Sequence, residues 1–298
     1  MEDAGPPTRL VIAHVKGLAT ALHAIRAGSK QACCVKIDSS GLELRWEDES
    51  KTLQSLVFLK PEMFGQFSVG SVARFSVQFS QLLDTLNVFS PIQSSTELCY
   101  PGPNGELSLE SSDNSRGTTM VTYARIASIE MPDMRDLEDF WEEPHSHFLT
   151  QGAVMKEVIE DLEWPGGNVT LQMDRNPPRL LISASGTGRL EADMPVSELS
   201  GFHCEPPELC HSYRYKALRA AFCNLPNPKE AGAISTKVTV DRNGMLKVTH
   251  VISLAPPSSA HDARFGGGSQ GGWGAETQRV FDLARSATVH FFILPLAE

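Results

Sequence analysis

Hydrophobic and polar positions along the chain repeat one order of elements four times. In the first unit an apolar run at 9–15 precedes Leu18, Leu22 and Ile25, whose spacing places them on one face of a helix. Three strand-like runs follow, at 32–37, 42–46 and 53–59. Short polar turns separate these runs. The pattern therefore predicts a strand–helix–strand–strand–strand (βαβββ) unit.

The same order recurs three more times at intervals of roughly 65–75 residues, which is longer than the period of common solenoid repeats. The first strands and helices of these units are predicted at 72–77 and from Ser80, at 147–150 and 154–162, and at 212–215 and 218–225. Their later strands are predicted at 96–100, 106–109 and 118–126, at 169–173, 180–184 and 188–194, and at 235–240, 245–254 and 279–294. Ser80 is expected to cap its helix.

One unit has a half-buried sheet and a single amphipathic helix, so it must pack against a neighbour. We therefore expect an α+β fold with two domains, each a duplicated βαβββ unit, at 1–127 and 147–298. The segment 128–146 has seven acidic residues, two prolines and little periodicity, which predicts an extended, solvated connector between the domains. The segment 256–277 is rich in glycine, serine and alanine and is expected to be a flexible loop.

Composition is typical of a globular protein, with 298 residues of which 41% are hydrophobic and 21% charged. The acidic start and the lack of an apolar run of about 20 residues argue against export and membrane insertion. Six cysteines in a chain of this length indicate free thiols rather than a disulfide framework. The net charge of −10 is unusual for a protein that grips DNA by charge. Any role on DNA must therefore be local or topological.

Several stretches resemble a known family. They are 58–67 (FLKPEMFGQF), 75–89 (FSVQFSQLLDTLNVF), 153–165 (AVMKEVIEDLEWP), Phe202-His203-Cys204 and 244–248 (GMLKV). Together with the duplicated βαβββ order, they resemble the sliding-clamp fold of proliferating cell nuclear antigen. The resemblance is closest to the Rad-one type subunit of the DNA-damage checkpoint clamp, the nine-one-one complex. It extends from about Leu10 to Pro295, and the segment Gly266–Gly274 departs from the family pattern.

The resemblance implies a nuclear protein that forms a closed heterotrimeric ring around double-stranded DNA with Rad-nine and Hus-one type subunits. It also implies loading by a clamp loader and recruitment of checkpoint signalling and repair proteins. A closed ring cannot leave a duplex without opening, which reconciles DNA association with an acidic chain. Two alternatives are a homotrimeric replicative clamp and a 3′→5′ DNA exonuclease with the same fold.

Clamp helices line the hole of the ring, so cations on or beside the helices are the candidates for contact with DNA phosphates. These candidates are Lys16, His23, Arg26, Lys30, Lys156, Lys216 and Arg219. A solvated helix surface explains each of them singly as well. The second helix offers no cation, because Gln81, Asp84 and Asn87 are its outward residues. We expect a thinly basic inner surface and weak contact with DNA.

Clamp subunits meet by pairing edge strands, which satisfies backbone groups that an edge leaves unpaired. The resemblance assigns this role to the strands at 118–126 and 187–194. The candidate interface residues are Thr118, Val121, Tyr123, Ile126, Thr187, Leu190, Ala192 and Met194. The alternative is that each edge is covered within the chain.

The acidic connector contains apolar residues that need burial or a partner. They are Met131, Met134, Leu137, Phe140 and Trp141. The resemblance implies that they cover a pocket for partner peptides, whereas local packing against the domains is the alternative.

Metal binding and catalysis are not expected. His203-Cys204 and Cys210-His211 contain four potential ligands, but zinc sites usually have a Cys-x(2–4)-Cys spacing. Five residues separate Cys204 from Cys210. A nuclease would need several carboxylates converging on two metal ions, and the acidic residues gather in the connector and turns instead. We therefore predict no metal, no cofactor and no enzymatic activity.

Overall fold

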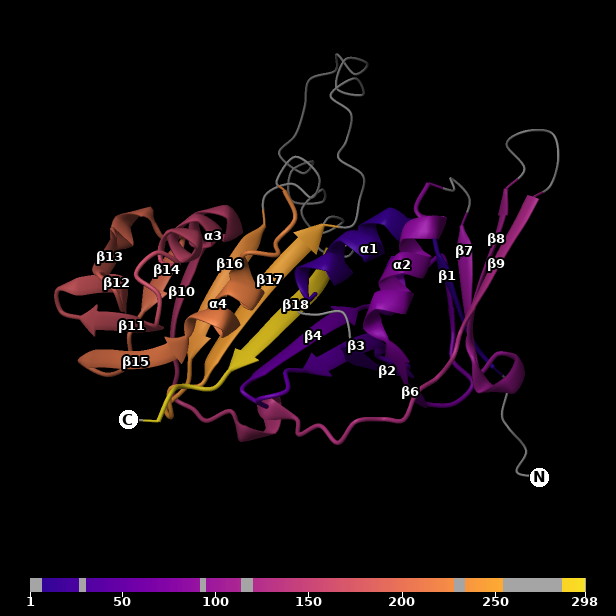
Figure 1. The fold of residues 1–298 in the computed structure, drawn as a ribbon, viewed down its shortest axis with the longest axis horizontal. Coiled ribbons are helices and arrows are strands. Elements are labelled where there is room, and N and C mark those ends of the chain that lie inside the picture. The colour runs from indigo at the N-terminus through magenta and orange to yellow at the C-terminus, as the bar shows by residue number, and fades with distance from the viewer. Residues whose placement is uncertain are drawn as a thin grey trace, which may run out of the picture.

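The computed structural model describes residues 7–26, 31–91, 95–113, 120–227, 234–253 and 286–297. In these parts the chain forms three antiparallel β-sheets and four α-helices (Figure 1). Lys30, Thr118 and the predicted loop at 256–277 lie outside the described residues. No helix in the described parts is long and apolar enough to cross a membrane.

The predicted βαβββ order recurs four times in the structure. The first half contains β1 (Thr8–Ile12), α1 (Val15–Ala24), β2 (Ala32–Asp38), β3 (Gly41–Glu47), β4 (Leu53–Leu59), β5 (Gln66–Ser68), β6 (Ala73–Gln78), α2 (Phe79–Phe89), β7 (Thr96–Tyr100), β8 (Leu107–Asp113) and β9 (Met120–Ile126). The second half contains β10 (Ser146–Gln151), α3 (Gly152–Asp161), β11 (Asn168–Arg175), β12 (Pro178–Ser185), β13 (Arg189–Met194), β14 (Gly201–His203), β15 (Glu208–Arg214), α4 (Tyr215–Phe222), β16 (Ser235–Val240), β17 (Leu246–Ser253) and β18 (Ser286–Ile293).

A nine-stranded sheet joins the two halves of the molecule. Its strand order is β14-β10-β16-β17-β18-β4-β3-β2-β6. The strands β18 and β4 pair in antiparallel fashion at the centre, from Thr288 opposite Phe58 to Ile293 opposite Leu53. A five-stranded sheet, β5-β1-β7-β8-β9, flanks it at one end and a four-stranded sheet, β13-β12-β11-β15, at the other (Figure 1).

The helices bury their apolar faces in the core, as the spacing of their leucines predicts. Leu22 on α1 and Leu86 on α2 are fully buried, and these two helices pack together. α3 packs on α4 in the same way in the second half. α1 and α4 both contact the central strand β18, and Asn224 Nδ2 donates to Arg26 O at 2.7 Å. The four helices therefore form one layer that is continuous across the junction of the two halves; it is called the helical layer below.

The chain leaves each half through a corresponding backbone contact. After β9, the backbone N–H of Ile129 donates to Ser76 O in β6 at 2.8 Å, and after β18 that of Leu296 donates to Ser212 O in β15, also at 2.8 Å. Ser76 and Ser212 hold corresponding positions, because β6 leads into α2 as β15 leads into α4. The internal repeat therefore extends to the chain that leaves each half.

Three details differ from the sequence expectation. Ser80 is inside α2 rather than at its N-cap, because the helix begins at Phe79, whose N–H donates to Gln31 O at 2.8 Å. The short strands β5 and β14 were not predicted, and β15 begins at Glu208 rather than at 212. A strand of three residues is too short to show a period of two.

His250 is a fully buried polar residue of β17. Its Nδ1 lies 2.8 Å from Thr236 Oγ1, and its Nε2 lies 3.0 Å from Ala221 O. A carbonyl oxygen only accepts, so Nε2 carries the proton and Nδ1 accepts from the threonine hydroxyl. Burial lowers the pKa of His250 to about 4, although the hydrogen bond to Ala221 acts in the opposite direction.

This burial predicts acid sensitivity. Because the folded pKa of about 4 lies below the ordinary 6.5, the unfolded chain binds the proton first as the pH falls. The contribution of neutral His250 to the free energy of unfolding is complete above pH 6.5. As the pH falls from 6.5 to 4, this contribution decreases by about 3 kcal/mol. Urea unfolding at pH 7 and at about pH 4.5 should show a smaller loss of unfolding free energy in His250→Asn than in the wild type. Equal losses in the two proteins would contradict this role.

Candidate functional site

Two edge strands lie at opposite ends of the molecule (Figure 1). β9 pairs only with β8, and β13 pairs only with β12, within the described parts of the chain. The outer backbone groups of both strands are therefore available to a strand from another chain. The structure places Val121, Tyr123 and Ile126 on β9. It places Leu190, Ala192 and Met194 on β13, with Thr187 just before it.

The exposed side chains of the two edges differ in chemistry. Met120, Val121 and Tyr123 on β9 are large, apolar and exposed. On β13 the exposed residues are charged, and Arg189 pairs with Glu191 while Asp193 pairs with Arg179 at 3.0 Å. Ile126 and Met194, which were expected at the interface, are buried within the chain at the strand ends. The exposed residues therefore make β9 a largely apolar edge and β13 a charged edge, whereas the candidates Leu190 and Ala192 on β13 are half-buried.

The helical layer carries little net charge. Its helices contain Lys16, Lys156, Lys216 and Arg219 as cations and Asp84, Glu157, Glu160 and Asp161 as anions. Arg219 Nη1 lies 2.9 Å from Glu163 Oε1, and Lys156 Nζ lies 4.0 Å from Glu160 Oε1. Lys16, Arg26 and Lys216 are exposed, whereas His23 is half-buried. Two of these cations, Arg219 and Lys156, therefore lie beside a carboxylate, and the four helices carry as many anions as cations.

The middle of the connector is docked on the nine-stranded sheet, while most residues of this segment are exposed. Leu137 is buried against Met245 and Phe292, and Trp141 packs on the same cluster. The buried Gln54 side chain fixes the backbone here: its Nε2 donates to Arg135 O at 2.5 Å, and its Oε1 accepts from Leu137 N at 3.2 Å. Apolar burial and two hydrogen bonds thus hold the middle of the connector.

Lys247 on β17 also contacts the connector, through an ion pair and aromatic rings. Its Nζ lies 2.8 Å from Glu138 Oε1, 4.9 Å from the ring centroid of Phe292 and 6.0 Å from that of Trp141. A cation at these distances is attracted to an aromatic face. Burial lowers the pKa of the neighbouring His290 to about 4, and the charge of Lys247 acts in the same direction.

Part of the predicted partner surface stays exposed. Phe140 is 57% exposed and Met131 47%, whereas Met134 is half-buried. Four of the five connector residues therefore divide into two sets, and the half-buried Met134 lies between these extremes of exposure. Leu137 and Trp141 fill the chain's own apolar cluster, and Met131 and Phe140 face solvent beside it.

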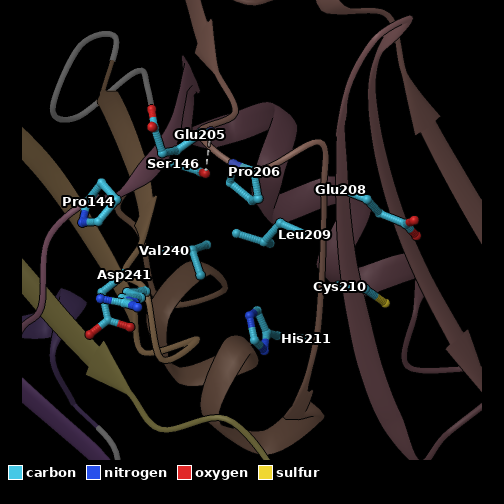
Figure 2. A pocket seen from close by; sticks show the side chains of 11 residues that line it. Pro144, Ser146, Glu205, Pro206, Glu208, Leu209, Cys210, His211, Val240 and Asp241 are labelled. Atoms are coloured by element: carbon cyan, nitrogen blue, oxygen red, sulfur yellow. Dashed lines mark hydrogen bonds between the residues drawn. The ribbon is translucent and has the colours of Figure 1, made fainter.

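A cavity of about 590 Å³ lies between β15, the start of the β16–β17 turn and the end of the connector. Leu209, Pro206 and Val240 approach its interior, while the side chains of Glu208 and Cys210 point away (Figure 2). Asp241 at its edge is buried, and it accepts hydrogen bonds from the backbone of Asn243, Met245 and Glu142. This carboxylate is therefore already satisfied by the chain.

The structure does not bring the four predicted metal-ligand candidates together. The thiol of Cys204 is buried and donates to Met173 O at 3.4 Å, whereas Cys210 is on the exposed face of β15. His203 Nε2 lies 3.1 Å from Glu205 Oε2 instead. Across the described residues, no group of three or more His, Cys, Asp or Glu side chains is arranged to hold a metal ion.

Comparison with known proteins identifies the family and the fold. Residues 10–252 match the family model described as Repair protein Rad1/Rec1/Rad17. A crystal structure of PCNA from Thermococcus kodakaraensis is similar, with a TM-score of 0.69, 12% sequence identity, and 97% of this chain and 100% of that chain covered. A PCNA2–PCNA3 complex from Sulfolobus tokodaii gives a TM-score of 0.66 and 13% identity at the same coverage. No curated protein matches the chain. The predicted sliding-clamp fold is confirmed.

The docked connector generates a prediction. Leu137→Ala should remove most of the apolar contact with Met245 and Phe292, at a cost of about 2 kcal/mol to docking. Limited proteolysis within 128–146 should then be at least about 10-fold faster, because cleavage requires local opening. Met131→Ala, at an exposed position of the same segment, is the matched control. Equal cleavage rates in the two variants would show that Leu137 does not hold the connector.

Proposed function

Since the chain belongs to the Rad1/Rec1/Rad17 family of repair proteins, we propose that it is one subunit of a heterotrimeric DNA-damage checkpoint clamp. The ring encircles double-stranded DNA in the nucleus and includes Rad-nine and Hus-one type subunits. A clamp loader places it on DNA, and the bound ring recruits checkpoint and repair proteins. The sliding-clamp fold of the chain supports this function.

The observation that carries the proposal is the pair of edge strands at opposite ends of the molecule (Figure 1). Unpaired strand edges invite pairing with another chain, and closure into a ring would pair both β9 and β13. A heterologous contact of this kind yields a ring when its rotation closes. β9 and β13 therefore supply one contact to each of two neighbours.

The equal numbers of cations and anions on the helices support a ring that stays on a DNA duplex because it is closed, and not because it binds phosphates strongly. Proteins that bind DNA through phosphates use a surplus of Lys and Arg, and the four helices here carry equal numbers of cations and anions. A closed ring needs no strong phosphate contact to remain on a duplex. It can therefore slide while holding other proteins nearby.

The outer surface around the connector supports the recruiting role. Exposed apolar residues such as Phe140 and Met131 are characteristic of protein-binding patches when they gather in one region. We assign no catalytic step to the chain, because the described carboxylates form no group suited to holding metal ions. Its function is to tether and present other proteins.

Ring assembly tests the proposal. Co-expression with the two other clamp subunits should give a complex with one copy of each chain, whereas this chain alone should not form a particle of three times its 32.5 kDa mass. Val121→Pro should weaken assembly because proline removes a strand N–H. Val121→Thr keeps the N–H and serves as the control. A stable homotrimer by light scattering would identify a replicative-type clamp instead.

The helical layer gives a second prediction. A variant with Arg26, Lys156, Lys216 and Arg219 changed to Gln should weaken binding of the ring to linear DNA at low salt by about 10-fold and flatten its salt dependence. Rings already closed on circular DNA should remain bound, because their retention is topological. Lys60→Gln, at an exposed position outside the helices, is the control. An unchanged salt dependence would show that these four residues do not contact DNA.

A further inference from the structure

Trp164 is an exposed aromatic residue in the turn between α3 and β11. It is 67% exposed, although tryptophan is normally well covered in a folded chain. Its indole packs on one side against Gly188, just before β13, where a Cβ would come within 2.6 Å of the ring. The rest of the ring faces solvent beside the charged edge of the molecule.

The turn that carries Trp164 is held in a fixed position. Thr187 N donates to Pro165 O at 2.9 Å, and Gly186 N donates to Gly188 O at 2.9 Å. A Cβ at Gly186 would lie 2.0 Å from Pro165 O, so only glycine permits this close approach. The indole is therefore presented by a rigid contact between two turns and not by a loose loop.

Its location indicates what covers it. β13 begins at Arg189, directly after the turn that supports the indole, and its outer backbone groups have no partner strand within the described chain. A strand from another chain can pair with this row of backbone N–H and C=O groups. A chain that pairs with β13 along its length would therefore lie beside Trp164.

The opposite edge has a similar arrangement. α2 packs against β9, and Val88 on α2 is 63% exposed. An exposed apolar residue thus stands in the turn after α3 on the β13 side, and another on α2, the helix that packs against β9. An exposed apolar residue that becomes covered on assembly is a common form of interface hot spot.

We propose that Trp164 is the anchor that holds the neighbouring ring subunit paired with β13. This inference rests on the proposed clamp function. The neighbour presents an aliphatic or aromatic side chain from the helix beside its own edge strand, and this side chain packs on the free face of the indole. The backbone ladder of β13 sets the alignment of the two subunits, and the indole supplies most of the affinity.

The test measures the dissociation constant of that neighbour from the co-expressed ring. Trp164→Ala should raise it by at least about 30-fold, as expected for an aromatic hot spot. Gly188→Ala should raise it several-fold, because its Cβ displaces the indole without removing it. Val72→Ala removes an exposed apolar side chain directly before β6, in the other half of the molecule, and should leave the constant unchanged. Melting temperatures of the isolated variants show that each is folded.

Leu190→Pro removes a backbone N–H of β13 and should weaken strand pairing there. It therefore distinguishes failure of this inference from failure of the proposed function. If Leu190→Pro opens the ring and Trp164→Ala has no effect, the clamp stands and the anchor is wrong. If neither variant affects the ring, β13 is not an interface and both are overturned. If Trp164→Ala rings assemble normally but bind recessed DNA ends more weakly, the indole stacks on an unpaired base, which also overturns the anchor.

Discussion

The pairing of β18 with β4 is the contact on which the rest of the molecule depends. Each sheet edge is a row of backbone groups that can pair with another strand. The pairing of β18 with β4 closes an edge of each half internally, while β9 and β13 remain among the strands at sheet edges. The internal closure turns two half-molecules into one nine-stranded sheet and brings α1 and α4 over the same strand. The open edges at β9 and β13 then face outward at a fixed separation, as ring closure requires.

Sequence periodicity predicted most of the elements because the core faces are regular. Leu18, Leu22 and Ile25 mark a helix, because residues i and i+7 share a face of a helix but not of a strand. Leu82, Leu86 and Phe89 have the same spacing. The cap of α2 could not be predicted, since its first N–H finds Gln31 O, a partner supplied by a neighbouring segment. For a similar reason the sequence left open whether the connector packs on the domains: Leu137 is buried by Met245 and Phe292, which are far away in sequence.

The candidate site was predictable in outline and not in detail. The two edge strands followed from the repeat and the family pattern. The pairing of Arg219 with Glu163, which offsets the charge of the helical layer, depends on an approach of α4 to the end of α3 that no local pattern encodes. Trp164 follows Leu162 and Glu163 just after a helix, and no local pattern places its indole against Gly188, which is distant in sequence.

The order of translation has a consequence for the pairing of β4 with β18. β4 is among the first strands to leave the ribosome and β18 is the last. Throughout translation, the apolar β4 therefore carries an edge that nothing in the emerged chain can cover. The first half must either be shielded by a chaperone or wait in a partly open state until the C-terminal strand arrives. The nine-stranded sheet can therefore close only after β18, the last of its strands in the sequence, has been made.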